Sequence, residues 1–174
     1  IVIPTERAGA LSLRDTDGLS ITNTNTDGGS GGLSIIDSTG GTIEDVIVTV
    51  ARTRSALSVF GEVDAHHDHN ITDITANNLP IYYYRRLENQ TLDGNGVDTF
   101  NLHCALCTNV TIQNYVFPTY TAGGVRLWGG SGVTVADNVF DRPTGPLRLW
   151  KSSGTLVRGN SFSASASLSV PSML

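Results

Sequence analysis

Lysine is almost absent from this chain: Lys151 stands alone beside ten arginines, and 16 acidic residues bring the net charge to −5. A nucleic-acid-binding domain would carry a basic face, so this balance excludes that class of partner. No run of about 20 apolar residues is present, so no membrane insertion is predicted. The two cysteines, Cys104 and Cys107, are too few for a disulfide framework.

Glycine is abundant, with 19 residues, and Ser, Thr, Asn and Asp fill much of the remainder. This composition is typical of many short strands joined by tight turns, not of helices. The length predicts one domain, residues 1–174, with a substantial core. Because the chain begins at Ile1 and shows no signal peptide, we expect it to be processed or to be a fragment of a longer or oligomeric protein.

A repeat of 21 to 24 residues runs through the sequence. Short apolar strands recur as Leu11-Ser-Leu-Arg, Leu33-Ser-Ile-Ile, Leu57-Ser-Val-Phe, Ile81-Tyr-Tyr-Tyr, Leu102-His-Cys-Ala, Val125-Arg-Leu-Trp, Leu147-Arg-Leu-Trp and Leu168-Ser-Val. A strand of this length cannot bury its apolar face alone, so neighbouring copies must stack. The spacing therefore predicts an all-β solenoid of about seven coils.

Each first strand is followed by a second one with its own signature. Val133-Thr-Val-Ala-Asp-Asn-Val-Phe aligns with Thr155-Leu-Val-Arg-Gly-Asn-Ser-Phe, and the same frame fits Thr72 to Leu79, Gln90 to Val97 and Val110 to Phe117. The shared bend position holds Asn77, Asn95, Asn138 and Asn160. Asparagine tolerates the left-handed backbone conformation, and its amide can hydrogen-bond to the next copy, so we expect a ladder along the bend.

These repeats resemble the right-handed parallel β-helix repeat family, whose coils read roughly apolar-Thr-Ile/Val-x-Asn-x-Phe. The resemblance covers about residues 9 to 170. It implies a single-stranded right-handed parallel β-helix, a fold shared by pectate and alginate lyases, mannuronan epimerases, polygalacturonases and phage tailspikes. Most of these proteins act on acidic polysaccharides, so the resemblance implies a polysaccharide partner. Since one fold hosts many functions, the site needs its own argument.

Alternation along each first strand points its first and third residues inward and its second and fourth outward. One predicted outward column contains Tyr82, His103, Arg126 and Arg148, and its neighbour contains Phe60, Tyr84, Ala105, Trp128 and Trp150. Coils stack at about 4.8 Å, the ordinary spacing of paired strands. An exposed aromatic column is typical either of a surface covered by a loop or a second subunit, or of a face that binds sugar rings.

The segment from Gly61 to Asn70 gathers three of the four histidines beside several carboxylates. It loosely resembles the Asp-Pro-His-Asp/Glu catalytic segment of mannuronan C5-epimerases, with Asp64, His66 and Asp68 as the matching residues and Ala65 in place of proline. His and Asp at this spacing are also found as ligands of a divalent cation. The third interpretation, which we favour, is an exposed polar turn without a cofactor.

The outward column also predicts a catalytic arrangement. A uronate lyase or epimerase must neutralise the substrate carboxylate and remove the C5 proton, and Arg126 or Arg86 suits the first task while His103 or Tyr82 suits the second. Hydrolysis would need two carboxylates roughly 5 to 10 Å apart, which the column lacks, so lyase or epimerase chemistry ranks higher.

Cys104 falls at an inward position, where we expect a free cysteine packed as a small hydrophobe. The sequence as a whole favours an extracellular or virion-surface β-helix that engages acidic polysaccharide, with Phe60, Tyr84, Trp128, Arg148 and Trp150 as binding residues. The alternative is a non-catalytic structural or receptor-binding module of a phage tailspike or fibre, assembled as a homotrimer.

Overall fold

The computed structural model describes residues 2–4, 11–28, 31–51, 55–118, 123–141 and 145–163. The chain divides into two compact units, an N-terminal unit of residues 1–83 and a C-terminal unit of residues 84–174. Almost every regular element is a strand, and the helical element among the described residues is the 3-10 turn η1 (Asp64–His67). No helix in these residues is long and apolar enough to cross a membrane.

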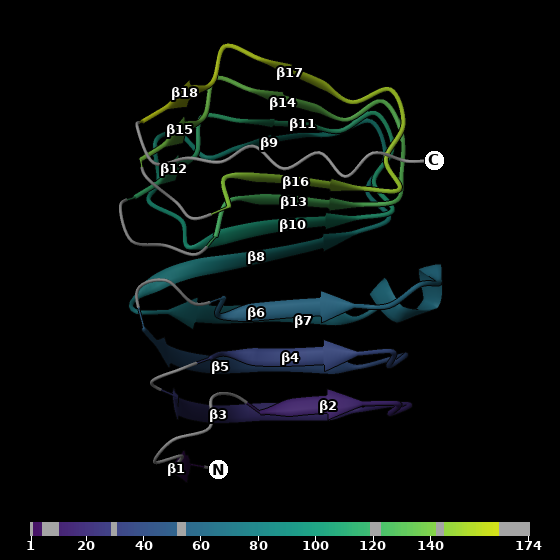
Figure 1. Ribbon diagram of the computed structural model, residues 1–174, viewed down its shortest axis with the longest axis vertical. Helices are drawn as coiled ribbons and strands as arrows, with labels where there is room; N and C mark the ends of the chain where they lie inside the picture. The colour runs from purple at the N-terminus through teal and green to yellow at the C-terminus, as the bar shows by residue number, and fades with distance from the viewer. Residues whose placement is uncertain are drawn as a thin grey trace. The chain divides into compact units, whose positions relative to one another are not determined.

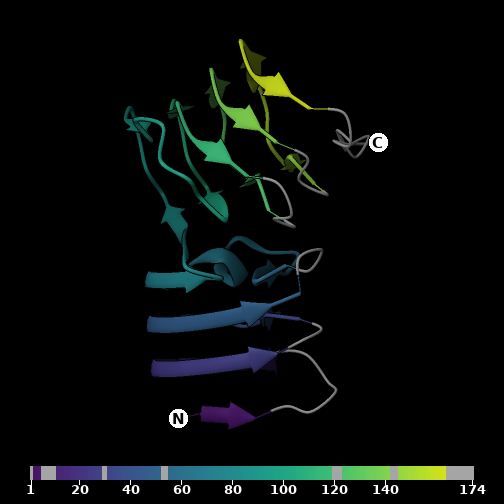
Figure 2. The ribbon, with the colours of Figure 1, turned by 90° about the vertical axis from the view of Figure 1, so that its left-hand side faces the viewer.

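The N-terminal unit is built from two parallel sheets, with three rungs that each contribute a strand to both (Figure 1). Figure 2 shows the same rungs after a quarter turn. One sheet has the order β1-β3-β5-β7 and the other β2-β4-β6. The strands are β1 (Val2–Pro4), β2 (Ser12–Arg14), β3 (Ser20–Gly28), β4 (Leu33–Ile36), β5 (Thr42–Val50), β6 (Leu57–Phe60) and β7 (Asn70–Ala76), and β8 (Leu79–Arg85) begins in this unit.

In each long strand of this unit, one residue with a positive φ shifts the alternation of the side chains. Apolar residues before and after it therefore both face the core. In β5, Ile43 and Val46 are both buried although three positions separate them, because Asp45 between them has φ of 53°. Asn23 in β3 and Asp73 in β7 adopt the same conformation. Asn and Asp accept a positive φ more readily than other side chains, so these residues mark the bend in each rung.

One local prediction in this unit is wrong. The frame that aligned Thr72 to Leu79 with the other second strands placed Asn77 in the asparagine ladder, but β7 and β8 instead form an antiparallel hairpin with Ile74 opposite Ile81. Asn77 and Asn78 have φ of 49° and 65°, as a two-residue type I′ turn requires. The strand from Ile81 to Tyr84 therefore does not continue the sheet β2-β4-β6.

The C-terminal unit has three strands in each coil and three stacked parallel sheets (Figure 1). They are β10-β13-β16, β9-β11-β14-β17 and β12-β15-β18. The strands are β9 (Thr91–Asp93), β10 (Asn101–Ala105), β11 (Thr111–Gln113), β12 (Val116–Phe117), β13 (Val125–Trp128), β14 (Thr134–Ala136), β15 (Val139–Phe140), β16 (Leu147–Trp150), β17 (Leu156–Arg158) and β18 (Ser161–Phe162). A left-handed residue at 114, 137 and 159 separates the second strand of each coil from the third.

Like residues stack on like residues inside this unit. The Phe117 and Phe140 ring centroids lie 4.9 Å apart, and those of Phe140 and Phe162 lie 4.8 Å apart, both pairs nearly parallel. The asparagine ladder is confirmed for Asn138 and Asn160: the Asn138 backbone N–H donates to Asn160 Oδ1 at 3.0 Å. The left-handed residue is the one before each asparagine, not the asparagine itself.

The predicted solenoid is confirmed, with about six turns instead of seven. The first strands that begin at 33, 57, 125 and 147 have the bounds that the repeat predicts, and their first residues are buried. The predicted copy at Leu168 lies outside the described residues. Asn95 does not join the ladder, because two extra residues follow β9 before Asp98 pairs with Val116.

Candidate functional site

Strands β13 and β16 present two tryptophans and two arginines on one outward face of the C-terminal unit. Their register places Arg126 beside Arg148 and Trp128 beside Trp150. The alternating residues Val125, Leu127 and Leu147 are buried, so the intervening side chains must point away from the core. We call the four outward residues Arg126, Trp128, Arg148 and Trp150 the Trp–Arg surface. The predicted register of these strands is confirmed.

The two tryptophans form a tilted stack that is open on one side. Their ring centroids lie 5.7 Å apart with 39° between the ring planes. Lys151 Nζ lies 5.1 Å from the centroid of Trp128, within the range of a cation–π contact. Trp150 is 52% exposed, whereas Trp128 is half-buried. Trp150 is therefore the ring with the larger area available to a ligand.

The arginines raise the positive potential next to these rings. Burial, together with the smaller effect of the neighbouring Arg148 charge, lowers the pKa of Arg126 to about 10. Arg126 remains protonated at neutral pH, because this pKa lies well above 7. Asp141, which follows β15, accepts a hydrogen bond from the Ser163 hydroxyl at 2.9 Å. The surface thus combines apolar ring faces with two guanidinium groups.

The preceding coil contributes His103 and Ala105 to the same sheet face. His103 lies opposite Arg126 and Ala105 opposite Trp128 in the β10–β13 register. His103 is only 5% exposed, and its Nε2 lies 2.9 Å from Asn101 Nδ2. Asn101 is itself fully buried. The imidazole is therefore adjacent to Arg126 in the sheet but largely shielded from solvent.

A family model described as a right-handed beta helix region matches residues 9–162. The chain belongs to the right-handed β-helix family. No curated protein matches it, and no solved structure matches it. Membership in this family agrees with the stacked parallel coils and leaves the function to be argued from the site.

The other predicted aromatic and arginine residues of this β-helix lie on different elements. Phe60 is 44% exposed on β6, which pairs with β4, so the column that stacked Phe60 on Tyr84 is not formed in the β2-β4-β6 sheet. Tyr82 and Tyr84 are half-buried on β8. Arg86 follows β8 with φ of 50°, and its backbone N–H donates to the Ala105 carbonyl at 2.9 Å. Arg86 thus forms a corner of the coil.

The histidine-rich loop of the N-terminal unit is built into the fold more deeply than an exposed turn. His67 and His69 are buried, and the Gly41 backbone N–H donates to His69 Nδ1 at 3.0 Å. Burial lowers the pKa of His67 to about 4 and lowers the pKa of His69 as well. The neutral His69 ring hydrogen-bonds to the preceding coil through Gly41, whereas the His67 ring hydrogen-bonds to the Gly61 carbonyl of its own loop. The prediction of an exposed polar turn is therefore wrong for these two residues.

The three residues matched to the epimerase segment surround this packed pair. Asp64 is exposed in η1, Asp68 is half-buried, and His66 Nδ1 lies 3.5 Å from Asp37 Oδ1. Across the described ranges, no group of three or more His, Cys, Asp or Glu side chains is arranged to hold a metal ion. Asp64 and His66 belong to the N-terminal unit, and the Trp–Arg surface belongs to the C-terminal unit.

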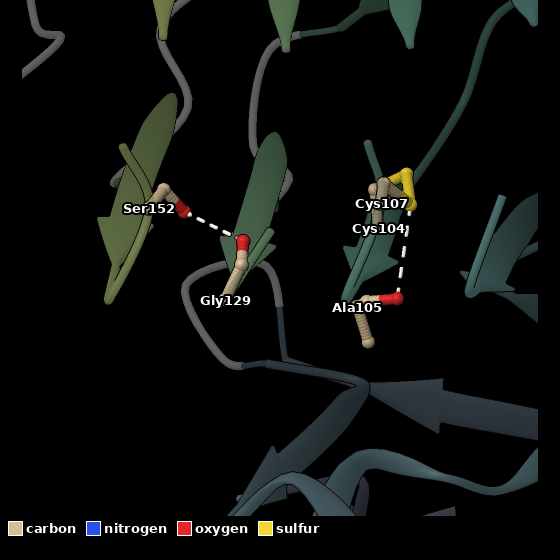
Figure 3. Close-up of a disulfide and its surroundings, with 5 residues drawn as sticks. All are labelled: Cys104, Ala105, Cys107, Gly129 and Ser152. Carbon is tan, nitrogen blue, oxygen red and sulfur yellow. Dashed lines mark hydrogen bonds between the residues drawn. A yellow bond between two sulfur atoms is a disulfide. The ribbon is translucent and has the colours of Figure 1, made fainter. Parts of the chain in front are cut away.

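The two cysteines form a disulfide, which corrects the prediction of a free, apolar Cys104 (Figure 3). The inward position of Cys104 is confirmed, because Cys104 and Cys107 are each 1% exposed. The bond spans Leu106, which has φ of 58°, a conformation that branched side chains rarely adopt. Cys107 Sγ also contacts the Ala105 carbonyl oxygen at 3.7 Å. The disulfide therefore links β10 to the turn that leads into β11.

Two residues beside the Trp–Arg surface were not predicted. Asn101 contacts the imidazole of His103, and Lys151 lies over Trp128. Lys151 directly follows the repeated strand and is the chain's single lysine, so the sequence held a signal for it. Asn101 is the first residue of β10, at the position where the next coil has Gly124, and only the packing shows its role.

Proposed function

We propose that the Trp–Arg surface binds an acidic polysaccharide. The observation that carries the proposal is the register of β13 and β16, which sets two guanidinium groups beside two stacked indoles on one outward face. Indole faces suit the apolar faces of sugar rings, and guanidinium groups pair with carboxylates. A neutral polysaccharide would use only the tryptophans, so the arginines favour a polymer of uronic acids.

The distance between neighbouring strands suits a polysaccharide chain that runs across them. Neighbouring strands in a sheet are about 4.8 Å apart, which is close to the length of one pyranose unit. Each coil would then meet one sugar, with its ring near the tryptophan column and its carboxylate near the arginine column. Trp150 would supply the main ring contact because it is the more exposed of the two.

One observation favours a second function, β-elimination or C5 epimerisation of the bound uronate. His103 occupies the register position next to Arg126. In a lyase reaction, Arg126 would neutralise the carboxylate and His103 would take the C5 proton. The electrons of the C5–H bond would form a C4–C5 double bond as the C4–O bond breaks, and the leaving oxygen would take a proton from water. His103 is only 5% exposed, so this reaction would require the substrate to reach a ring that is shielded from solvent. We therefore rank polysaccharide binding without catalysis above lyase or epimerase activity.

An extracellular or virion-surface location is part of the same proposal. A disulfide such as Cys104–Cys107 persists in oxidising surroundings and is rare in the cytosol. Acidic polysaccharides are met outside the cell. Assembly as a homotrimer, as in a tailspike, is the alternative use of the same surface, since exposed aromatic residues also mark subunit interfaces.

The experiment is calorimetric titration of the full chain with polygalacturonate, alginate and, as the neutral comparison, dextran. We expect binding to the two acidic polymers and not to dextran. Trp150→Ala and Arg148→Gln should each weaken that binding at least tenfold. Phe60→Ala is the matched control, because it removes another exposed aromatic ring, from a different sheet, and it should leave affinity unchanged.

Two further readouts separate the alternatives. Ultraviolet absorbance of an unsaturated uronate, followed during incubation with each polymer, would appear only if the surface is a lyase site. Sedimentation of Trp150→Ala should match that of the unaltered chain if the surface binds sugar. A mutant that dissociates a trimer, together with an unaltered chain that binds no acidic polymer, would refute the proposal.

A further inference from the structure

The last described coil of the C-terminal unit ends in open strand edges. Within the described residues, β16, β17 and β18 are the outermost strands of their sheets (Figure 1). Leu156 and Arg158 use their backbone groups to pair with β14. Val157, between them, therefore directs its N–H and C=O to the opposite side. Such an edge is a template for a further strand.

Side chains of core positions are exposed at this edge. Ile112, Val135 and Val157 occupy the same inward position in successive coils. Ile112 and Val135 are fully buried, whereas Val157 is 38% exposed. Phe162 of β18 is 42% exposed, although the ring of Phe140 on which it stacks is fully buried. The apolar columns of the unit thus reach an open end.

The N-terminal unit has a coil with the same turns and a free edge. Among the described strands, β2 and the first part of β3 (Ser20–Thr22) are paired on one side, with β4 and β5. Asp15, Gly18 and Asn23 of this coil have φ of 52°, 64° and 49°. At the same spacing, residues 151, 154 and 159 of the last described coil have φ of 50°, 60° and 64°. Residues 11–23 therefore follow the same path as residues 147–159.

The two edges carry opposite charge. Residues 145–163 contain Arg148, Lys151 and Arg158 and no acidic residue. Residues 11–51 contain six carboxylates and a single cation, Arg14. Pairing residue 147 with residue 11 would set the exposed Lys151 beside the exposed Asp15, at the strand spacing of about 4.8 Å. Opposite charges at paired positions of neighbouring strands are stabilising.

We propose that a second copy of this chain docks head to tail on this edge, with its β2 on β16 and its Ser20–Thr22 segment on β17. This register sets Leu13 beside Leu149. It also sets the buried Ile21 beside Val157, so the inward column of the second strands continues into the next copy. A head-to-tail contact leaves one free edge on each copy, so it extends to short filaments. It uses strand edges and does not depend on polysaccharide binding.

Strand β1 competes for part of this contact. It pairs with residues 25 to 27 of β3, on the side away from β5. β18 of the neighbouring copy would take that place, because it follows β17 as residues 25 to 27 follow the Ser20–Thr22 segment. Complete docking therefore displaces β1. Ile3→Pro, which places a second residue without an N–H beside Pro4, should weaken β1 and tighten the association at least threefold.

The first test is sedimentation velocity of the full chain over a range of concentrations. We expect the average mass to rise with concentration and to fall with added salt. Val157→Pro and Thr22→Pro each remove an N–H on the empty side and keep the existing pairs, and each should weaken the association at least tenfold. Thr91→Pro, at the opposite edge of the β17 sheet, is the matched control and should change nothing.

Mixing the two blocked variants tests the head-to-tail geometry. Val157→Pro keeps the N-terminal edge and Thr22→Pro keeps the C-terminal edge, so each alone should be monomeric while an equimolar mixture forms a 1:1 dimer and nothing larger. Circular dichroism of each variant checks that the coils remain folded.

A charge exchange tests the register. Lys151→Glu and Asp15→Lys should each weaken the association at least fivefold, and the double variant should restore it to within twofold of the unaltered chain.

The proposal is overturned by a chain that stays monomeric at every concentration, by folded proline variants that associate like the unaltered chain, or by a mixture that stays monomeric. It is also overturned if the double charge variant is not restored, or if Ile3→Pro weakens the association. Loss of acidic-polymer binding in Trp150→Ala concerns the Trp–Arg surface alone, so failure of either proposal is recognised separately.

Discussion

Replacing Asn138 by leucine should lower the free energy of unfolding by about 2 to 3 kcal/mol. Asn138 is 1% exposed, its Oδ1 accepts from the Tyr115 N–H at 3.0 Å, and its Nδ2 donates to the Ile112 and Ala136 carbonyls at 3.0 and 2.9 Å. Leaving a buried polar group without a partner costs about 1 to 3 kcal/mol, and at about 1 to 2 kcal/mol for each of these three groups the total is roughly 3 to 6 kcal/mol. The added apolar burial of leucine offsets about 1.5 to 3 kcal/mol of that loss.

Urea unfolding followed by circular dichroism measures this difference. Asn160→Leu should lose less, about 1 to 2 kcal/mol, because Asn160 is half-buried and its partners are nearer solvent. Val139→Ala, an exposed neighbour, is the control and should change stability by no more than about 0.5 kcal/mol. The reasoning is refuted if Asn138→Leu is as stable as the unaltered chain, or if Asn160→Leu is the more damaging of the two.

Two other predictions concern stability. Replacing both Cys104 and Cys107 by alanine should lower stability by about 2 kcal/mol, since the bond closes a short loop, and an unchanged urea midpoint would contradict this. The pKa of His67 is lowered to about 4 in the folded chain, and that of His69 is also lowered. Below the ordinary histidine pKa of about 6.5, the unfolded chain therefore binds more protons than the folded chain. Stability should therefore be flat above about pH 6.5 and fall between there and about pH 4. Unfolding measured across this range should show a shallower slope in His67→Gln, and an equal slope would count against the buried-histidine interpretation.

The predictions that succeeded depend on periodicity alone. In Val125-Arg-Leu-Trp and Leu147-Arg-Leu-Trp, alternation and the repeat distance fix which side chains face outward and which copies lie side by side. The same information places Asn138 over Asn160. Because each coil contacts its immediate neighbours, a local pattern determines the long-range register.

The hairpin at Asn77 shows where periodicity stops being sufficient. Asparagine favours positive φ both at a solenoid bend and in a type I′ turn, so the residue type does not distinguish the two. In the structure, Asn77 still bonds across to the preceding coil, with its Oδ1 accepting from the Val50 N–H at 3.1 Å. The side chain hydrogen-bonds to a neighbouring coil outside the asparagine ladder, while the backbone reverses direction.

The histidine loop shows a different limit. Several histidines next to carboxylates suggested a reactive or metal-binding segment, but His69 fits against a glycine 28 residues earlier in the chain. A Cβ at Gly41 would come within 2.8 Å of His69 Nδ1, so the absence of a side chain there permits the contact. Such a fit depends on which residues meet between coils. The loop's own sequence holds no sign of it.

Stacking like on like has opposite consequences for different residue types in this β-helix. It favours the Phe117, Phe140 and Phe162 column, whose rings pack face to face. It is unfavourable for Arg126 beside Arg148, where burial and the neighbouring charge both lower the pKa of Arg126. The repeat that builds the core therefore also builds a pair of repelling charges. An anionic polymer with one charge per coil would place a separate counter-charge beside each arginine, whereas a small anion would supply a single one for both. This difference is the physical reason to propose a polymer as the ligand of the Trp–Arg surface.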